Sequence, residues 1–96
     1  MPAYVVVETD IHDLEQYAHY KAASPAAVAA GGGHFVARGG ELAVLEGDWN
    51  PKRLVILEFE DLEAVKRWYE SPGYQEAKKL REGAANLNMV AVEGIS

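Results

Sequence analysis

The sequence predicts a ferredoxin-like α+β fold, an antiparallel sheet with helices on one face, and three observations support this class. Segments typical of strands and helices follow one another in the order β-α-β-β-α-β. The chain has 96 residues, enough for one hydrophobic core, and so a single domain is expected over residues 1–96. The strands are apolar at successive positions, which indicates a sheet that is buried on both faces.

Four strands are expected, each a short run rich in β-branched and apolar residues. Gly39-Gly40 leaves two alternatives for the chain after the second strand. The pair is either a two-residue hairpin turn or a bulge within one long strand that resumes at residues 41–46. The four strands are predicted at residues 3–9, 34–38, 53–59 and 88–93.

The first helical segment has recognisable start and stop signals. Asp13, with Gln16 three residues later, has the spacing of a capping box, so the helix begins there. Ser24-Pro25 has the form of a second start, with Ser as N-cap and Pro at N1, and predicts a kink after residue 23. The glycines at 31–33 end the helix. Its core face is predicted to consist of Leu14, Tyr17, Ala18 and Lys21.

The second helical segment is predicted to be two helices. Asp61 caps the first of them, whose core face contains Val65 and Tyr69, while Trp68 lies to one side of that face. Ser71-Pro72 again places a capping Ser before a Pro at N1. A separate helix is therefore expected over residues 72–83.

The strand pattern also predicts a homodimer. In an antiparallel sheet with one solvated face, apolar and polar residues should alternate. The helices can cover only one face, so the other would expose a larger apolar surface than soluble monomers tolerate. We therefore expect a second copy to pack on it, sheet against sheet. The strand segments that are apolar at both parities are 5–7, 42–45, 54–57 and 89–92.

Composition excludes several classes of function. Nine basic against fifteen acidic residues give a net charge of −6, which argues against nucleic acid or a membrane as partner. The chain has no cysteine and no signal-like start, so disulfides are excluded and the cytoplasm is the expected compartment. His12, Glu15 and His19 have helical spacing but no further ligand nearby, so neither a metal site nor a cofactor is predicted.

Several short motifs carry a resemblance that runs from end to end. They are residues 33–40, Glu46-Gly47 with Pro51 and Arg53, Glu58-Phe59, residues 69–75, Arg81 and residues 92–94. In their order and spacing they resemble a bacterial family, the domain of unknown function numbered 1330. His34 stands where that family is expected to have Arg or Lys, and Gly73 where Glu is expected.

The resemblance implies a dimeric α+β barrel, in which the sheets of two protomers pack together. Members of that superfamily include cofactor-free monooxygenases, haem-degrading enzymes and isomerases. They usually hold their ligand in a pocket between the sheet and the helices. The family itself brings no established activity to this chain.

Arg38 is the leading candidate for ligand contact. It ends a strand beside two glycines that can leave space, and a guanidinium is suited to a carboxylate or another anion. The alternative is a structural arginine paired with Glu41, Glu46 or Glu58. Arg53, at the start of the central strand, could act with Arg38, or could be a solvated strand end.

Aromatic residues and one histidine complete the candidate set. Tyr20 and Trp68 lie off the predicted core faces and could border a pocket, whereas Tyr69 has the position of a packing residue. His34 is the histidine predicted on a strand, where a haem-ligand or acid–base role competes with a structural one.

Together these features predict a small-molecule-binding homodimer. Its ligand would be a small organic acid or an aromatic compound, and the protein could be a cofactor-independent enzyme of the monooxygenase or isomerase type. One alternative is a non-catalytic ligand-sensing or interaction module. A further alternative is a haem-binding protein that uses His34. A pocket of several hundred Å³ would favour the first hypothesis.

Overall fold

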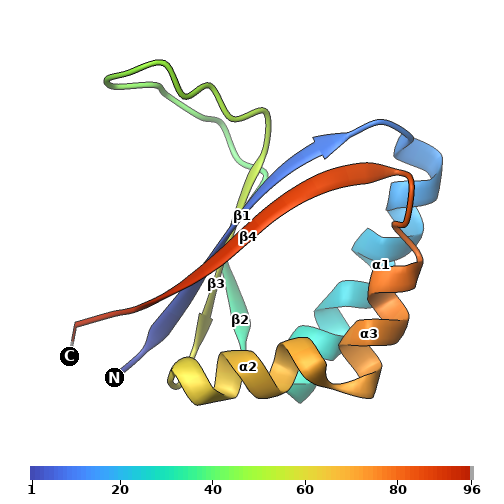
Figure 1. Cartoon of the computed structure of the whole chain (residues 1–96), viewed down its shortest axis with the longest axis vertical. Helices are drawn as coiled ribbons and strands as arrows, with labels where there is room; N and C mark the ends of the chain where they lie inside the picture. Colours follow the sequence, from blue (N-terminus) through green and yellow to red (C-terminus); the bar gives the residue numbers. More distant parts are fainter. Residues whose placement is uncertain (96) are drawn as a thin grey trace.

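The computed structural model describes residues 1–95 and has the predicted ferredoxin-like α+β architecture. Its strands form one antiparallel four-stranded sheet in the order β2-β3-β1-β4. The helices lie together on one side of that sheet (Figure 1). The elements in chain order are β1 (Ala3–Ile11), α1 (Leu14–Ala30), β2 (His34–Arg38), β3 (Leu54–Phe59), α2 (Leu62–Glu70), α3 (Pro72–Lys79) and β4 (Ala85–Glu93).

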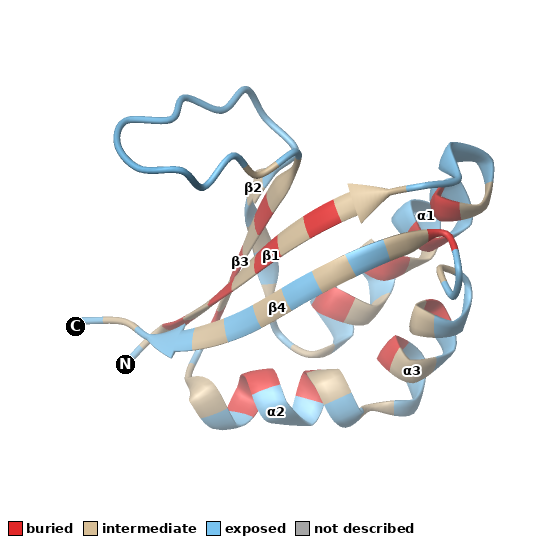
Figure 2. Cartoon of the chain, turned by 45° about the horizontal axis from the view of Figure 1, so that its top comes forward, coloured by how far each residue is buried: buried red, intermediate tan, exposed pale blue. Residues whose placement is uncertain are grey.

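The core lies between the helices and the sheet face that they cover. Buried positions alternate along β1 and β3, as the side chains of a pleated strand must (Figure 2). Aromatic rings from the helices fill the space above them. The buried strand residues are Ala3, Val5, Val7, Thr9, Val55, Leu57 and Phe59, and the largest buried helix residues are Tyr17, Tyr20, Trp68 and Tyr74.

Helix α1 is a single helix from Leu14 to Ala30, so the predicted second start at Ser24-Pro25 is wrong. A proline inside a helix deprives the carbonyl four residues earlier of its N–H donor, and here that carbonyl belongs to Lys21. Arg38 Nη2 donates to this oxygen at 2.7 Å. Because a donor from the sheet replaces the missing N–H, the helix continues through the proline.

The buried face of α1 also differs from the predicted one. Leu14 is 75% exposed, and Ala18 and Lys21 are exposed as well. The helix is turned because it packs against α3 as well as the sheet. The residues that it buries are Tyr17, Tyr20, Ser24 and Val28.

The predicted break at Ser71-Pro72 is confirmed. The Asp61 carboxylate accepts a hydrogen bond from the Ala64 N–H at 2.8 Å and caps α2. Ser71 has extended backbone angles, and its hydroxyl accepts from the Tyr74 N–H at 3.2 Å. Helix α3 ends at Lys79, four residues before the predicted end (83 minus 79), and β4 begins at Ala85, three residues before the predicted 88.

Neither alternative for Gly39-Gly40 is correct. Gly39 has φ +71°, a left-handed conformation that favours glycine, and its N–H donates to Leu54 O at 2.9 Å. This bond closes the β2-β3 ladder, and beyond it the chain leaves the sheet. Residues 41–46, predicted as strand, belong to an exposed loop that projects from the sheet (Figure 1).

The loop returns along the sheet face that the helices do not cover. Trp49 Nε1 donates to Glu8 Oε2 at 2.9 Å. Lys52 Nζ lies 3.3 Å from Asp10 Oδ1, an exposed ion pair. These contacts join the end of the loop to β1.

The face that lacks helices is largely apolar, and we call it the outer face. Tyr4, Val6 and Ile56 lie on it, half-buried by their neighbours in the sheet. On the adjacent edge strand β4, Val90 is 64% exposed and Val92 is 55% exposed. The strands are therefore apolar on both faces, as the sequence predicted. Within residues 1–95, no helix has the length and apolar character needed to cross a membrane.

Candidate functional site

A bulge in β2 turns Arg38 toward the helices. Up to Phe35 the pairing with β3 is regular, but the register shifts by one residue at Val36. A shift of one residue reverses which side of the sheet each later side chain faces. Arg38 consequently pairs with Val55, whose side chain is in the core, instead of sharing the outward direction of His34. The bulge was not predicted, because it depends on pairing with β3.

Arg38 and Arg53 meet at a narrow cavity between α1 and the sheet. The cavity measures about 30 Å³, which is room for one or two water molecules. The large pocket that would favour an organic ligand is therefore not open in this conformation. Its polar lining residues are Tyr17, Tyr20, Lys21, Ser24, Arg38 and Arg53, and its apolar wall includes Phe35, Trp68 and Met89.

Neither arginine forms an ion pair with a carboxylate among residues 1–95. Besides its bond to Lys21 O, the Arg38 guanidinium lies 4.5 Å from the centre of the Phe35 ring. Arg53 Nη1 is 3.5 Å from the Tyr17 hydroxyl. In a chain of net charge −6, two guanidiniums therefore meet at one cavity without an acidic partner among residues 1–95.

A tyrosine pair supports one side of the cavity. The hydroxyls of Tyr20 and Tyr74 are 2.8 Å apart, and Arg81 Nη2 donates to Tyr74 Oη at 3.3 Å. Burial raises the pKa of Tyr20, and the neighbouring Tyr74 hydroxyl raises it further. Burial alone would lower the pKa of Arg81, but the Tyr74 and Tyr20 hydroxyls hold it above its usual value. Tyr74 and Arg81 were not among the predicted site residues, because their contacts with Tyr20 depend on the packing of α3 against α1.

Trp68 is the most buried of the predicted site residues, at 2% exposure, so its predicted position beside the core face is wrong. Its ring packs 4.4 Å from that of Tyr74 and 5.1 Å from that of Phe59, measured between centres. The indole N–H has no hydrogen-bond partner in residues 1–95. Trp68 faces inward because α2 packs against the sheet and also contacts α1 and α3.

Trp68 also separates the cavity from a second hollow. This groove, of about 290 Å³, lies between α2 and β4, and both Trp68 and Met89 line both spaces. Val5 and Ala91 form part of its apolar surface. Tyr69, predicted as a candidate site residue, lines this groove, and its hydroxyl accepts from Lys78 Nζ at 2.9 Å.

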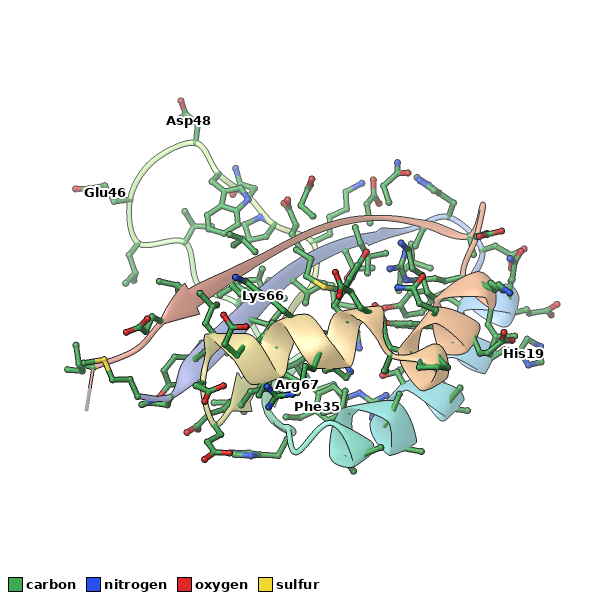
Figure 3. All side chains as sticks on the ribbon, turned by 60° about the horizontal axis from the view of Figure 1, so that its bottom comes forward. His19, Phe35, Glu46, Asp48, Lys66 and Arg67 are labelled. Atoms are coloured by element: carbon green, nitrogen blue, oxygen red, sulfur yellow. The ribbon has the colours of Figure 1, made fainter. Side chains whose placement is uncertain are left out.

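His34 is not part of either space. It is exposed on β2, where its Nε2 lies 3.5 Å from Glu58 Oε1. Phe35, the next residue, is labelled in Figure 3 and lines the cavity between α1 and the sheet. Residues 1–95 contain no group of His, Asp and Glu side chains that could hold a metal ion.

Comparison with known proteins places the chain in a family. The family model of a domain of unknown function, DUF1330, matches residues 2–95. The chain belongs to the DUF1330 family. Among proteins of curated function, none matches the sequence of this DUF1330 protein.

Several solved structures share the fold of this DUF1330 protein. A protein of unknown function from Rhodopseudomonas palustris is 22% identical, with 99% of this chain and 83% of that chain covered and a TM-score of 0.77. A dimeric ferredoxin-like protein of unknown function from Jannaschia sp. CCS1 is 16% identical, with coverages of 98% and 100% and a TM-score of 0.73. SnoaB, a cofactor-independent oxygenase from Streptomyces nogalater, is 14% identical, with coverages of 99% and 94% and a TM-score of 0.66. These likenesses confirm the ferredoxin-like fold.

Proposed function

We propose that this protein is a homodimer that binds a small organic acid, aliphatic or aromatic, at the cavity between α1 and the sheet. The observation that carries the proposal is the convergence of Arg38 and Arg53 on that cavity without a carboxylate partner in the described part of the chain. A guanidinium binds a carboxylate through two parallel hydrogen bonds, which gives both strength and orientation. The apolar and aromatic wall suits the body of such a ligand.

Binding requires the cavity to enlarge. About 30 Å³ cannot hold an organic acid, but the adjoining groove adds about 290 Å³ on the other side of Trp68 and Met89. Movement of these side chains would join the two spaces into a site of the usual size for a small ligand. The unpartnered Trp68 N–H would then have access to an acceptor on the ligand.

Catalysis without a cofactor is the second candidate. This protein shares its fold with SnoaB, a cofactor-independent oxygenase, so cofactor-free oxygenation is an activity for which this protein can be assayed. The haem-binding alternative has no support from the site, because His34 lies beside Glu58 and outside both spaces.

The homodimer is proposed to form through the outer face. Its exposed valines and the apolar loop residues Leu42, Val44 and Leu45 leave a surface that association would remove from water. We expect sedimentation to show a dimer, and Val90→Asp, which places a charge on the outer face, to give a folded monomer. Leu14→Asp is the control, because Leu14 is at least as exposed as Val90 but lies on a helix. A wild-type monomer at micromolar concentration would exclude this dimer.

Ligand binding can be tested by thermal unfolding with benzoate, acetate and the neutral benzamide as probes. A ligand present at a hundred times its Kd stabilises the folded state by about 2.7 kcal/mol, which is readily measured. We expect benzoate but not benzamide to raise Tm. Arg38→Ala should abolish that shift, and Arg67→Ala, which removes an exposed arginine of α2, should retain it. If no acid shifts the wild-type Tm, the sheet–helix cavity is not an acid-binding site.

A further inference from the structure

The Lys21 carbonyl that accepts from Arg38 lies four residues before Pro25, a proline in the interior of α1. Pro25 lies inside α1, eleven residues after its first residue and five before its last (25 minus 14, and 30 minus 25). In a regular helix the N–H of residue 25 would donate to Lys21 O. Proline has no N–H, and its ring also presses against that carbonyl. The Lys21 oxygen therefore lacks its helical donor and is open to another one.

Arg38 is the donor that takes this place. Its Nη2 reaches Lys21 O at 2.7 Å from the end of β2, and the β2 bulge is what brings the side chain to this side. The bond joins α1 to the sheet beside the cavity that both residues line. The carbonyl is neutral and accepts from only one N–H group of the guanidinium. The other N–H donors of Arg38 remain available to a ligand.

We propose that Pro25 holds Arg38 in an exchangeable resting contact and thereby sets the affinity of the cavity for anions. This inference rests on the proposed function. A carboxylate offers two charged oxygens in place of one neutral oxygen, so an entering acid displaces the Lys21 carbonyl from Arg38. Lys21 is exposed, so water can then bond to the released carbonyl. An acid must break the resting contact before it can bind Arg38, so the contact lowers the affinity of the cavity for the acid. A variant in which Arg38 does not make this contact is expected to bind the acid more tightly.

The resting contact is tested first without any ligand, by a double-mutant cycle read out with chemical denaturation. Pro25→Ala restores an N–H that can donate to Lys21 O, so Arg38 loses its role there. We expect Arg38→Ala to raise the unfolding equilibrium constant about five- to tenfold in the wild-type chain. In the Pro25→Ala background the same change should raise it by less than about twofold. Equal effects in both backgrounds would show that the proline and the arginine are independent, and would overturn the inference.

The effect on affinity is tested by titrating benzoate into the wild type and Pro25→Ala. We expect Pro25→Ala to bind benzoate about three- to tenfold more tightly, because Arg38 no longer has to leave a carbonyl. Pro72→Ala is the matched control and should bind like the wild type, since Pro72 is the first residue of α3 and away from the cavity. If Pro25→Ala and the wild type bind equally, the inference fails and the proposed function stands. If neither binds, the proposed function fails, and anion exchange at Arg38 fails with it.

Discussion

The dipeptide Ser-Pro occurs twice in the helical segments, and the two copies have opposite outcomes. At Ser71-Pro72 the chain leaves helical geometry, and α2 and α3 are separate helices. At Ser24-Pro25 the helix α1 continues without interruption. Since the two residues are the same, the difference lies in what surrounds them.

The carbonyl that each proline deprives of a donor shows what differs. For Pro72 that carbonyl is Trp68 O, which accepts from the Ser71 N–H at 3.1 Å and from the Ser71 hydroxyl at 2.7 Å. For Pro25 it is Lys21 O, which accepts from Arg38 at the end of β2. The missing donor is replaced by the neighbouring serine in the first case and by an arginine of the sheet in the second. A helix can therefore pass through a proline when tertiary structure supplies the missing donor.

Trp68 is the residue where the two helical regions meet, and its loss should have the largest effect. A Cβ placed on Gly31, just after α1, would come within 2.8 Å of Trp68 Cβ, so the two elements are in close contact. We expect Trp68→Ala to lower the free energy of unfolding by about 3–5 kcal/mol, because a buried aromatic ring is replaced by a cavity. Urea denaturation gives this value. A loss below about 1 kcal/mol would mean that the helices do not rely on this ring.

Alkaline pH should weaken the contact between the same two regions through Tyr20 on α1 and Tyr74 on α3. The pKa of Tyr20 is raised by burial in the folded state, so the folded protein holds this proton more tightly than the unfolded chain. The stabilisation is present below the unfolded pKa of about 10 and is lost as pH rises above it. We expect the free energy of unfolding to fall by up to about 1.4 kcal/mol per pH unit for this group. Tyr20→Phe should have a shallower slope, and an unchanged slope would contradict the raised pKa.

The two serines should differ in their contribution to stability. Ser71→Ala removes a cap that both accepts from Tyr74 N–H and donates to Trp68 O, and should cost about 1 kcal/mol. Ser24→Ala should be close to neutral, because Ser24 is buried within a continuous helix and alanine is the better helix former. Thermal unfolding of both variants measures the contrast. Equal losses would show that Ser24 also acts as a cap.

Pro72→Ala should also have a small effect on stability. The first position of a helix requires no N–H donor, and the Trp68 carbonyl already has its donors from Ser71. We expect the free energy of unfolding to change by less than about 0.5 kcal/mol, which guanidinium denaturation can resolve. A change above about 1 kcal/mol would mean that Pro72 does more than begin α3.

The candidate site shows where prediction from the sequence ended. Arg38, Arg53, Tyr20 and Trp68 were identified by residue type, and all four line the cavity. Their partners were not identified, because the sequence does not show that Arg38 would meet a main-chain carbonyl instead of a glutamate. Lys21 lies seventeen positions from Arg38 in the sequence, and the contact requires a bulge, a proline and the packing of α1 together.

The order of the elements and the caps at Asp13, Asp61 and Ser71 follow from the sequence alone. Each of these caps bonds an N–H three residues further along the chain, so the information needed for it is local. Tertiary structure decided which face α1 buries and that residues 41–46 leave the sheet, since a helix turns to fit its neighbours and a strand needs a partner. It also decided that α1 continues through Pro25, because the donor that replaces the lost N–H comes from a different element of the fold.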